Sequence, residues 1–376
     1  MTEAITRKTR IGIIGVGIIG EQHLINYAKD DRVEVIAACD INPDRLADMC
    51  AKYGIPNRYE NIGRLLDRDD LDAVDVCLHN HLHAPVSIEV MRRGRHVYCE
   101  KPMAGTYADA LSMYEASRTY GKMLHIQLAF LYQLETRVAK RFIESGDLGR
   151  IYHARSTGFR RRGRPYVDGY ATKEFVNSAW SGGGALFDMA VYHISQLLYL
   201  LGNPEPERIT GRVYQEIAMD DNRQAISGYN VEEFGCGFAR FKDGLTMDIV
   251  ESWAAHLDSF GGSSIMGSEA GLRMDPLSFH TTRHDVQSDT TFDLAAMQYR
   301  ESTVHAERAK HFESSQKHWV SALRGEVDLL DTAGIALNTS LIQAGIFLSG
   351  QLGREVTADE VKSLSKKASR EIPNLV

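Results

Sequence analysis

Residues 11–20 of the chain read IGIIGVGIIG, an apolar run that passes directly into a Gly-x-Gly-x-x-Gly pattern. The run predicts a buried strand at Ile11–Ile14, and the residues after it predict a helix that reaches about Lys29. The first glycine permits a tight turn, the second lets the backbone approach a pyrophosphate, and the third lets the helix pack closely on the strand. The helix start also favours phosphate charge. The loop residues expected to bind a dinucleotide are Gly15, Gly17, Ile18, Ile19 and Gly20.

The next apolar run ends on a carboxylate. Val33–Cys39 predicts a second strand, and Asp40 follows it twenty positions after Gly20. A carboxylate at this point accepts hydrogen bonds from the ribose hydroxyls of adenosine and repels a 2′-phosphate. Asp40 therefore predicts NAD as the cofactor, although the nearby Arg45 leaves NADP possible.

Short strands and helices alternate through the rest of the first third, which predicts a parallel sheet covered on both faces. The further expected strands are Ala73–Leu78, His96–Cys99 and Met123–Ala129. The expected helices are one from Asn42-Pro43 to the stop at Gly54, then Ala84–Arg93 and Tyr107–Tyr120. This is the pattern of a doubly wound Rossmann domain, which we assign to residues 1–130.

The pattern changes after residue 130 and predicts an α+β domain, residues 131–376, with a mainly antiparallel open sheet. This domain is expected to bind substrate and to form oligomers. Its expected strands include Ile151–Thr157, Phe234–Phe241 and Leu245–Trp253. Its expected helices include Leu134–Ser145, Ala185–Leu201, Ala306–Leu323 and Thr332–Leu348. One face of such a sheet needs a cover, which is either solvent or a partner subunit.

The segment Glu100-Lys101-Pro102 follows a predicted strand of the Rossmann domain. Ligands of doubly wound sheets bind at the carboxyl ends of the strands. A lysine there can donate a proton or hydrogen bond to a substrate oxygen, and a positively charged nicotinamide beside it is expected to depress its pKa. A plain surface lysine at a strand end is the alternative interpretation.

A second segment, Gly182 to His193, leads into a predicted helix. Asp188 and Tyr192 are four residues apart and share one helix face, whereas His193 points about a quarter-turn away. A carboxylate one turn before a phenol or imidazole is a plausible proton-handling pair.

In combination these segments resemble the Gfo/Idh/MocA oxidoreductase family, over nearly the whole chain. The resemblance rests on the glycine loop, Asn80-His81-Leu82-His83, Glu100-Lys101-Pro102, the glycine-rich approach to Asp188, and Ala322-Leu323-Arg324-Gly325. It implies a catalytic Lys101 close to nicotinamide and substrate, and a substrate-facing Asp188. It also implies that Asn80, His83, Glu100 and Lys101 contribute to cofactor binding, and that the open sheet mediates assembly.

The sequence departs from the family pattern at two positions. His79 stands where the family usually has proline, so the local turn is expected to differ. Tyr192 occupies the position of the family's catalytic histidine, and His193 is displaced by one residue. A phenol has an ordinary pKa near 10, so it would need Lys101 or the cofactor's charge to act as a base. Both Tyr192 and His193 therefore remain candidates for the proton-handling group.

Other clusters have less specific interpretations. His79, His81 and His83 alternate without a carboxylate or cysteine at ligand spacing, so no metal site is expected. The arginines from Arg160 to Arg164 either contact an anionic sugar or form a solvated loop. Tyr166 and Trp180 either stack on a pyranose or pack in the core.

Composition limits the function classes. The chain has 376 residues, a formal net charge of −7 and five cysteines. The negative charge argues against a nucleic-acid partner. The polar N-terminus, the lack of a long apolar run and the absence of a Cys-x-x-Cys pair predict a cytoplasmic protein with no membrane segment.

The sequence thus predicts an NAD(P)-dependent oxidoreductase, a dehydrogenase that transfers hydride between nicotinamide and a secondary alcohol of a sugar or polyol. A homodimer or homotetramer is expected. Two alternatives remain: a sugar–sugar oxidoreductase with a tightly bound cofactor, and a non-catalytic NAD(P)-sensing regulator. The sugar and the oxidised carbon are left open.

Overall fold

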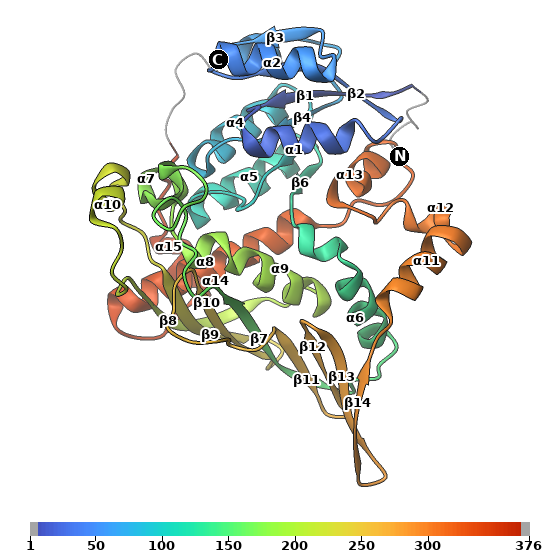
Figure 1. The fold of residues 1–376 in the computed structure, drawn as a ribbon, viewed down its shortest axis with the longest axis vertical. Coiled ribbons are helices and arrows are strands. Elements are labelled where there is room, and N and C mark those ends of the chain that lie inside the picture. The colour runs from blue at the N-terminus through green and yellow to red at the C-terminus, as the bar shows by residue number, and fades with distance from the viewer. Residues whose placement is uncertain (1–6, 370–376) are drawn as a thin grey trace.

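Two sheets organise the molecule, which we describe from a computed structural model covering residues 7–369 (Figure 1). The first sheet is parallel, with strand order β3-β2-β1-β4-β5-β6. Its strands are β1 (Thr9–Ile14), β2 (Val33–Cys39), β3 (Asn57–Tyr59), β4 (Ala73–Val76), β5 (His96–Cys99) and β6 (Leu124–Ile126). This order is that of the Rossmann fold. The predicted fold class is confirmed.

The helices between these strands begin and end largely where the sequence predicts. They are α1 (Ile18–Tyr27), α2 (Pro43–Tyr53), α3 (Ile62–Leu66), α4 (Asn80–Arg92) and α5 (Tyr107–Thr119). In α2 the Asn42 side chain accepts from the amide of Arg45, and Gly54 closes the helix in the left-handed region. The prediction for α4 was wrong at its start, because the helix begins at Asn80 rather than Ala84.

The second sheet has nine strands in the order β14-β13-β12-β11-β7-β10-β9-β8-β15. All neighbours are antiparallel except β7 and β10, which run parallel. The strands are β7 (Ile151–Phe159), β8 (Pro206–Tyr214), β9 (Phe234–Phe241), β10 (Thr246–Ser252), β11 (Ser264–Gly267), β12 (Ala270–Met274), β13 (Leu277–Arg283), β14 (Val286–Thr291) and β15 (Val356–Thr357). Of these strands, only β7, β9 and β10 correspond to strands whose residue ranges the sequence predicts.

Helices of the second domain lie on one face of this sheet (Figure 1). They include α6 (Leu134–Glu144), α8 (Ala185–Asp188), α9 (Ala190–Leu200), α14 (Thr332–Leu352) and α15 (Ala358–Leu364), whereas α13 (Ser315–Leu323) lies against the first sheet. The smaller elements are η1 (Ala129–Tyr132), η2 (Lys173–Val176), α7 (Ser178–Ser181), α10 (Asp221–Ser227), α11 (Leu294–Val304) and α12 (Ala306–Ala309). Within residues 7–369, no helix covers the opposite face of the sheet in Figure 1.

Two helices expected to be continuous are interrupted. The predicted helix Ala185–Leu201 breaks at Met189 into α8 and α9. The predicted helix Ala306–Leu323 breaks into α12 and α13, because Ser314 accepts from the amide of Lys317 and starts a new helix. Side-chain caps compete with helix continuation, and hydrophobic periodicity alone does not detect them.

Helix α13 returns from the C-terminal part of the chain to the first sheet. Its residues Trp319, Val320 and Leu323 share a buried cluster with Ile11 and Tyr98. The chain passes from the first sheet to the second near residue 130, but helix α13, which comes much later in the chain, packs against the first sheet. The division into 1–130 and 131–376 therefore stays a prediction.

Helix α14 is long and apolar enough, by length and composition, to cross a membrane. Two-thirds of its most apolar window is buried inside the protein. The helix contacts α5, α9 and strand β8, so its apolar surface is used in the core. A core helix of this kind meets the same criteria as a membrane span.

Candidate active site

The glycine loop has the geometry that its pattern predicts. Gly15 has φ +89, and a Cβ there would lie 2.2 Å from the carbonyl oxygen of Cys77. A Cβ on Gly20 would lie 2.0 Å from the carbonyl oxygen of Gly15. A Cβ on Gly17 would meet nothing within 4 Å, which leaves space where a pyrophosphate would approach.

The start of α1 is also open toward a ligand. No side chain caps this helix at Gly17, and Ile18 and Ile19 are exposed by 73% and 42%. Exposed isoleucines beside uncapped amides fit a loop that is covered by a bound dinucleotide. The residues present therefore fit the NAD that the pattern predicts.

Asp40 is fixed against this loop. Its Oδ2 accepts from the amide of Val16 at 2.8 Å, and its Oδ1 accepts from the amide of Asn42 at 2.9 Å. Arg45 donates to the carbonyl of Val16 and forms an ion pair of 2.6 Å with Glu21. The nearest candidate for binding a 2′-phosphate is thus already paired, and the binding of the ribose by Asp40 stays a prediction.

Lys101, Asp188 and Tyr192 lie together where the two domains meet. The Lys101 Nζ donates to the Oδ1 of Asp188 at 2.8 Å and lies 4.5 Å from the centre of the Tyr192 ring. The Trp253 Nε1 donates to the other oxygen of Asp188 at 3.1 Å. Lys101 follows β5, whereas Asp188 ends α8 and Tyr192 lies in α9. Tertiary structure brings together the three residues that the sequence selected.

In this structure the pKa of Lys101 is shifted in the direction opposite to the one expected beside a bound nicotinamide. Burial lowers the pKa of Lys101, but Asp188, Tyr192 and Glu100 outweigh it, so the pKa is raised above its usual value. The sequence had predicted a depressed lysine pKa. That prediction considered only the cationic nicotinamide, and it could not foresee a carboxylate in direct contact.

The pKa values of Asp188 and Tyr192 are shifted in opposite directions. Burial raises the pKa of Asp188, but Lys101 lowers it by more, so the carboxyl is ionised and its pKa is below the usual range. Burial raises the pKa of Tyr192 more than Lys101 lowers it. Without the cofactor, the cluster therefore contains an ammonium, a carboxylate and a protonated phenol.

His193 lies away from Lys101 and is engaged elsewhere. Its Nδ1 is 3.1 Å from both carboxylate oxygens of Glu251, and its ring packs edge-on against Phe130 at 5.5 Å. Burial lowers the pKa of His193, but Glu251 outweighs burial and raises it above its usual value. This geometry makes His193 the partner of a buried carboxylate. Whether His193 or Tyr192 handles the proton stays a prediction.

The other expected cofactor residues support the loops around the site. The Asn80 side chain donates to the carbonyl of Ser181 in the second domain at 2.7 Å. His83 is fully buried, and its ring nitrogens contact the carbonyl oxygens of Leu78 and Pro102 at 2.9 and 2.8 Å. The part that Asn80 and His83 play in cofactor binding stays a prediction.

Several other sequence candidates occupy structural positions. Arg164 is fully buried and paired with Asp168 and Glu233, so this member of the arginine segment is not available to an anionic sugar. Trp180 forms ring contacts with His79 and His81, at 5.7 and 4.9 Å. These contacts place His79 and His81 against the ring of Trp180.

Tyr166 and Arg160 complete the sequence candidates around this loop. The guanidinium of Arg223 lies 4.4 Å from the centre of the Tyr166 ring. Arg160 contacts the Tyr170 hydroxyl and contributes to the low pKa of Asp188. Of the arginine segment, Arg160 is thus the member that influences the cluster.

The sequence analysis missed two residues that the structure connects to this cluster. Trp253 fixes Asp188, but nothing in its sequence environment distinguishes it from a core residue. His23 contacts Glu100 at 2.8 Å. Its position three residues after Gly20, on the first turns of the loop helix, was a signal that could have been used.

Comparison with known proteins identifies the family of the chain. Residues 9–128 match a model described as an oxidoreductase family with an NAD-binding Rossmann fold, and residues 136–273 match the GFO/IDH/MocA C-terminal domain. The chain is 25% identical over 355 residues to the D-glucoside 3-dehydrogenase of Escherichia coli (strain K12), covering 92% of this chain and 97% of that protein.

Two further relatives extend the comparison. The chain is 26% identical over 262 residues to the myo-inositol 2-dehydrogenase of Thermotoga maritima, covering 63% of this chain and 75% of that protein. The structure of the WlbA dehydrogenase of Chromobactrium violaceum, in complex with NADH and UDP-GlcNAcA, superposes with a TM-score of 0.77 at 23% identity. That comparison covers 95% of this chain and 98% of that one, and it supports the fold. The chain therefore belongs to the Gfo/Idh/MocA oxidoreductase family, and it is an NAD-binding oxidoreductase of the dehydrogenase type.

Proposed function

We propose that the protein interconverts a secondary alcohol of a sugar or polyol and the corresponding ketone, with NAD as hydride carrier. The observation that carries this proposal is the contact of Lys101 with both Asp188 and Tyr192. The named relatives, which act on a glucoside and an inositol, support a polyhydroxylated substrate.

The proposed roles follow from the protonation states of the three groups. NAD supplies the acceptor for the hydride that leaves the carbinol carbon. The hydroxyl proton must leave the same substrate group, and a side chain in contact with that oxygen can take it up. The Lys101 ammonium and the Tyr192 phenol are proton donors in the direction of ketone reduction. Either one must first lose its proton to serve in alcohol oxidation.

Asp188 has a different role in this proposal. Its carboxylate is held by Lys101 on one oxygen and by Trp253 on the other. An ionised carboxylate accepts hydrogen bonds and donates none. Asp188 therefore orients the ammonium and can accept from a sugar hydroxyl beside the reacting one.

The decisive experiment is a screen of sugars and polyols with purified protein and NAD, followed by NADH absorbance. Because the pKa values of Lys101 and Tyr192 are raised, the oxidation should be measured up to alkaline pH. We expect turnover with at least one pyranoside or cyclic polyol. Absence of turnover with all of them, in both directions, would contradict the proposal.

The same preparation separates the two alternatives. A nucleotide that remains bound through purification and turns over only when a second sugar is supplied would indicate the sugar–sugar oxidoreductase. Binding of NAD without turnover of any sugar would indicate the regulator.

A further inference from the structure

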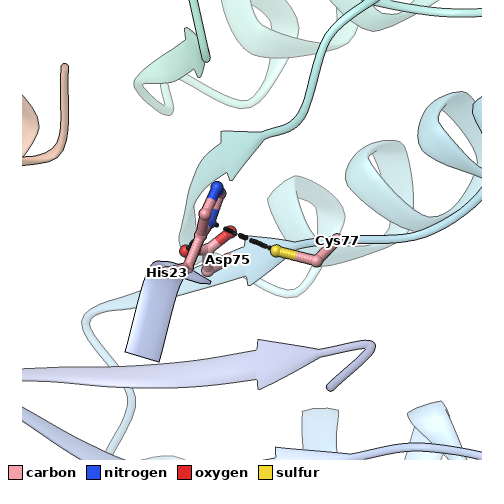
Figure 2. Close-up of side chains that lie close together, drawn as sticks. All are labelled: His23, Asp75 and Cys77. Atoms are coloured by element: carbon pink, nitrogen blue, oxygen red, sulfur yellow. Dashed lines mark hydrogen bonds and ion pairs between the residues drawn. The ribbon is translucent and has the colours of Figure 1, made fainter. Parts of the chain in front are cut away.

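A cluster of polar side chains lies inside the Rossmann domain, and Figure 2 shows three of them, His23, Asp75 and Cys77. His23 comes from α1, Asp75 from β4, and Cys77 follows β4. The His23 Nδ1 is 2.8 Å from the Asp75 Oδ2, and the His23 Nε2 is 2.8 Å from the Glu100 Oε1. All but Cys77 are buried.

The geometry favours a charged His23. Both of its ring nitrogens face carboxylate oxygens, and an ionised carboxylate accepts hydrogen bonds but donates none. With both carboxylates ionised, each ring nitrogen carries a proton and His23 is an imidazolium. Burial opposes this charge, but Asp75 and Cys77 outweigh burial and raise the pKa of His23 well above its usual value.

A metal ion is a weaker interpretation of the same cluster. The ligand atoms of His23, Asp75 and Cys77 lie within 4.8 Å of one another. Two ligands about 2.0 Å from a tetrahedral zinc are about 3.3 Å apart, whereas the His23 and Asp75 atoms are 2.8 Å apart. That distance is typical of a charge-assisted hydrogen bond. The Cys77 thiol and the Tyr27 hydroxyl both donate to Asp75, which completes the hydrogen-bond network without a metal ion.

The cluster reaches the active site through Glu100. The second oxygen of this carboxylate accepts from the backbone amide of Lys101 at 3.0 Å. Its negative charge is also one of the causes that raise the pKa of Lys101. Side-chain contacts thus connect Asp75 to His23 and His23 to Glu100, which binds the backbone amide of Lys101, and the ammonium of Lys101 pairs with Asp188 in the second domain.

We propose that His23 is a positioning residue for the active site, held as an imidazolium that orients Glu100 and thereby sets the place and proton affinity of Lys101. This proposal rests on the proposed function, because it assigns Lys101 to the hydroxyl chemistry. It also gives the glycine loop a second role, since the helix that receives the pyrophosphate carries, three residues after Gly20, the group that tunes the lysine.

The test is a pair of substitutions whose effects have opposite signs. In His23→Gln the positive charge of the imidazolium is lost while Glu100 keeps its negative charge, so the pKa of Lys101 rises. The alkaline limb of alcohol oxidation should then move to higher pH, and kcat should fall at least tenfold with little change in KM for NAD. In Glu100→Gln the negative charge is lost, so the limb should move to lower pH. The titratable groups that interact with Lys101 are Glu100, Asp188, Tyr192 and Tyr170.

His96→Gln is the matched control. His96 lies at the opposite end of strand β5 from Glu100, and burial lowers its pKa to about 4, so it is a neutral histidine. The control should leave the pH profile of oxidation unchanged. Equal shifts in His23→Gln and His96→Gln, or no shift in His23→Gln, would overturn the proposal.

A second measurement does not depend on activity or on the folding of His23→Gln. Nitrogen-15 NMR of histidine-labelled His193→Ala protein reports which imidazoles keep both ring protons at alkaline pH. His193 is removed because its pKa is raised as well. We expect one imidazolium to survive in this variant and to titrate in Glu100→Gln. If every histidine is neutral at alkaline pH, the proposal fails even when the sugar screen succeeds. If the imidazolium is present but no sugar turns over, the proposed function fails instead.

Discussion

The ammonium nitrogen of Lys101 lies 2.8 Å from the Oδ1 of Asp188, although 87 positions separate the two residues in the chain. Lys101 belongs to the Rossmann domain and Asp188 to the second domain, so this ion pair joins them. Both side chains are mostly buried, with 13% and 20% of their surface exposed. Removal of either partner would leave a charge in a poorly solvated position, which is strongly unfavourable.

Lys101→Ala should lower kcat by about a hundredfold or more, the usual scale for losing acid–base assistance, with little change in NAD affinity. Steady-state kinetics and NAD titration would measure both quantities. Lys140→Ala is a matched control, because Lys140 also lies over a tyrosine ring and pairs with Glu144, away from this site. A Lys101→Ala enzyme with nearly normal kcat would remove the lysine from the mechanism.

Tyr192→Phe should cause a loss of kcat similar to that of Lys101→Ala, because it removes the hydroxyl while preserving the ring over which Lys101 lies. His193→Ala should have a much smaller effect on kcat, since this histidine pairs with Glu251 rather than with Lys101. Turnover numbers of the two variants distinguish the candidates. The reverse ranking would make the imidazole the proton-handling group.

Asp40 should favour NAD over NADP by roughly ten- to hundredfold in kcat/KM, since a 2′-phosphate would meet a carboxylate there. Asp40→Asn keeps a hydrogen-bond acceptor for the Val16 amide but removes the charge, so the preference should narrow. Asp44→Asn, on the exposed first turn of α2, is the control. An unmodified enzyme that prefers NADP would refute the assignment.

Glu232 should make stability depend on pH. Burial is the main reason that its pKa is raised to about 7 in the folded protein, from an ordinary value of 4.5. The folded state therefore holds a proton that the unfolded chain has lost, and stability falls as pH rises from about 4.5 to about 7. The loss is at most about 3 kcal/mol.

Glu232→Gln should flatten this dependence and stabilise the protein mainly above pH 7, since an amide oxygen can still accept from the Leu186 amide. Urea unfolding at acidic and slightly alkaline pH would measure how the free energy of unfolding depends on pH. Glu207→Gln, at an exposed position of β8, should leave the slope unchanged. An equal slope in Glu232→Gln and the parent would exclude Glu232 as its source.

The uncovered face of the second sheet should bury itself against another copy of the chain, giving a dimer or tetramer. Phe234 and Phe260 lie in ring contact there, at 6.2 Å, and Phe159 packs on Phe260 at 5.0 Å. Phe238→Lys should weaken assembly without unfolding the chain, because the new ammonium would face Asp248 on the neighbouring strand. Light scattering at micromolar concentration would measure the oligomeric state of the parent protein and of Phe238→Lys. A monomeric parent protein would contradict this prediction.

The sequence by itself determined the Rossmann domain and the cofactor loop, because these depend on local rules. Gly15 takes a positive φ and Gly20 approaches the carbonyl of Gly15, so both constraints lie within the loop, and Asp40 follows at a fixed distance along the chain. Strands β9 and β10 were likewise visible as apolar runs. Strands β11 and β12 were not, since they have only four and five residues, and the edge strand β14 was not, since all six of its residues are exposed.

Only the tertiary structure decided how the selected residues work together. Lys101 was singled out from Glu100-Lys101-Pro102, but the direction of its pKa depended on Asp188, which comes from the second domain. The same holds for His23, whose charge depends on Asp75 in β4 and on Glu100 after β5. Electrostatic interactions act through space at a few ångströms, whereas sequence patterns report only neighbours along the chain. For this reason the sequence could select candidate residues that the fold brings together, but it could not give their protonation states.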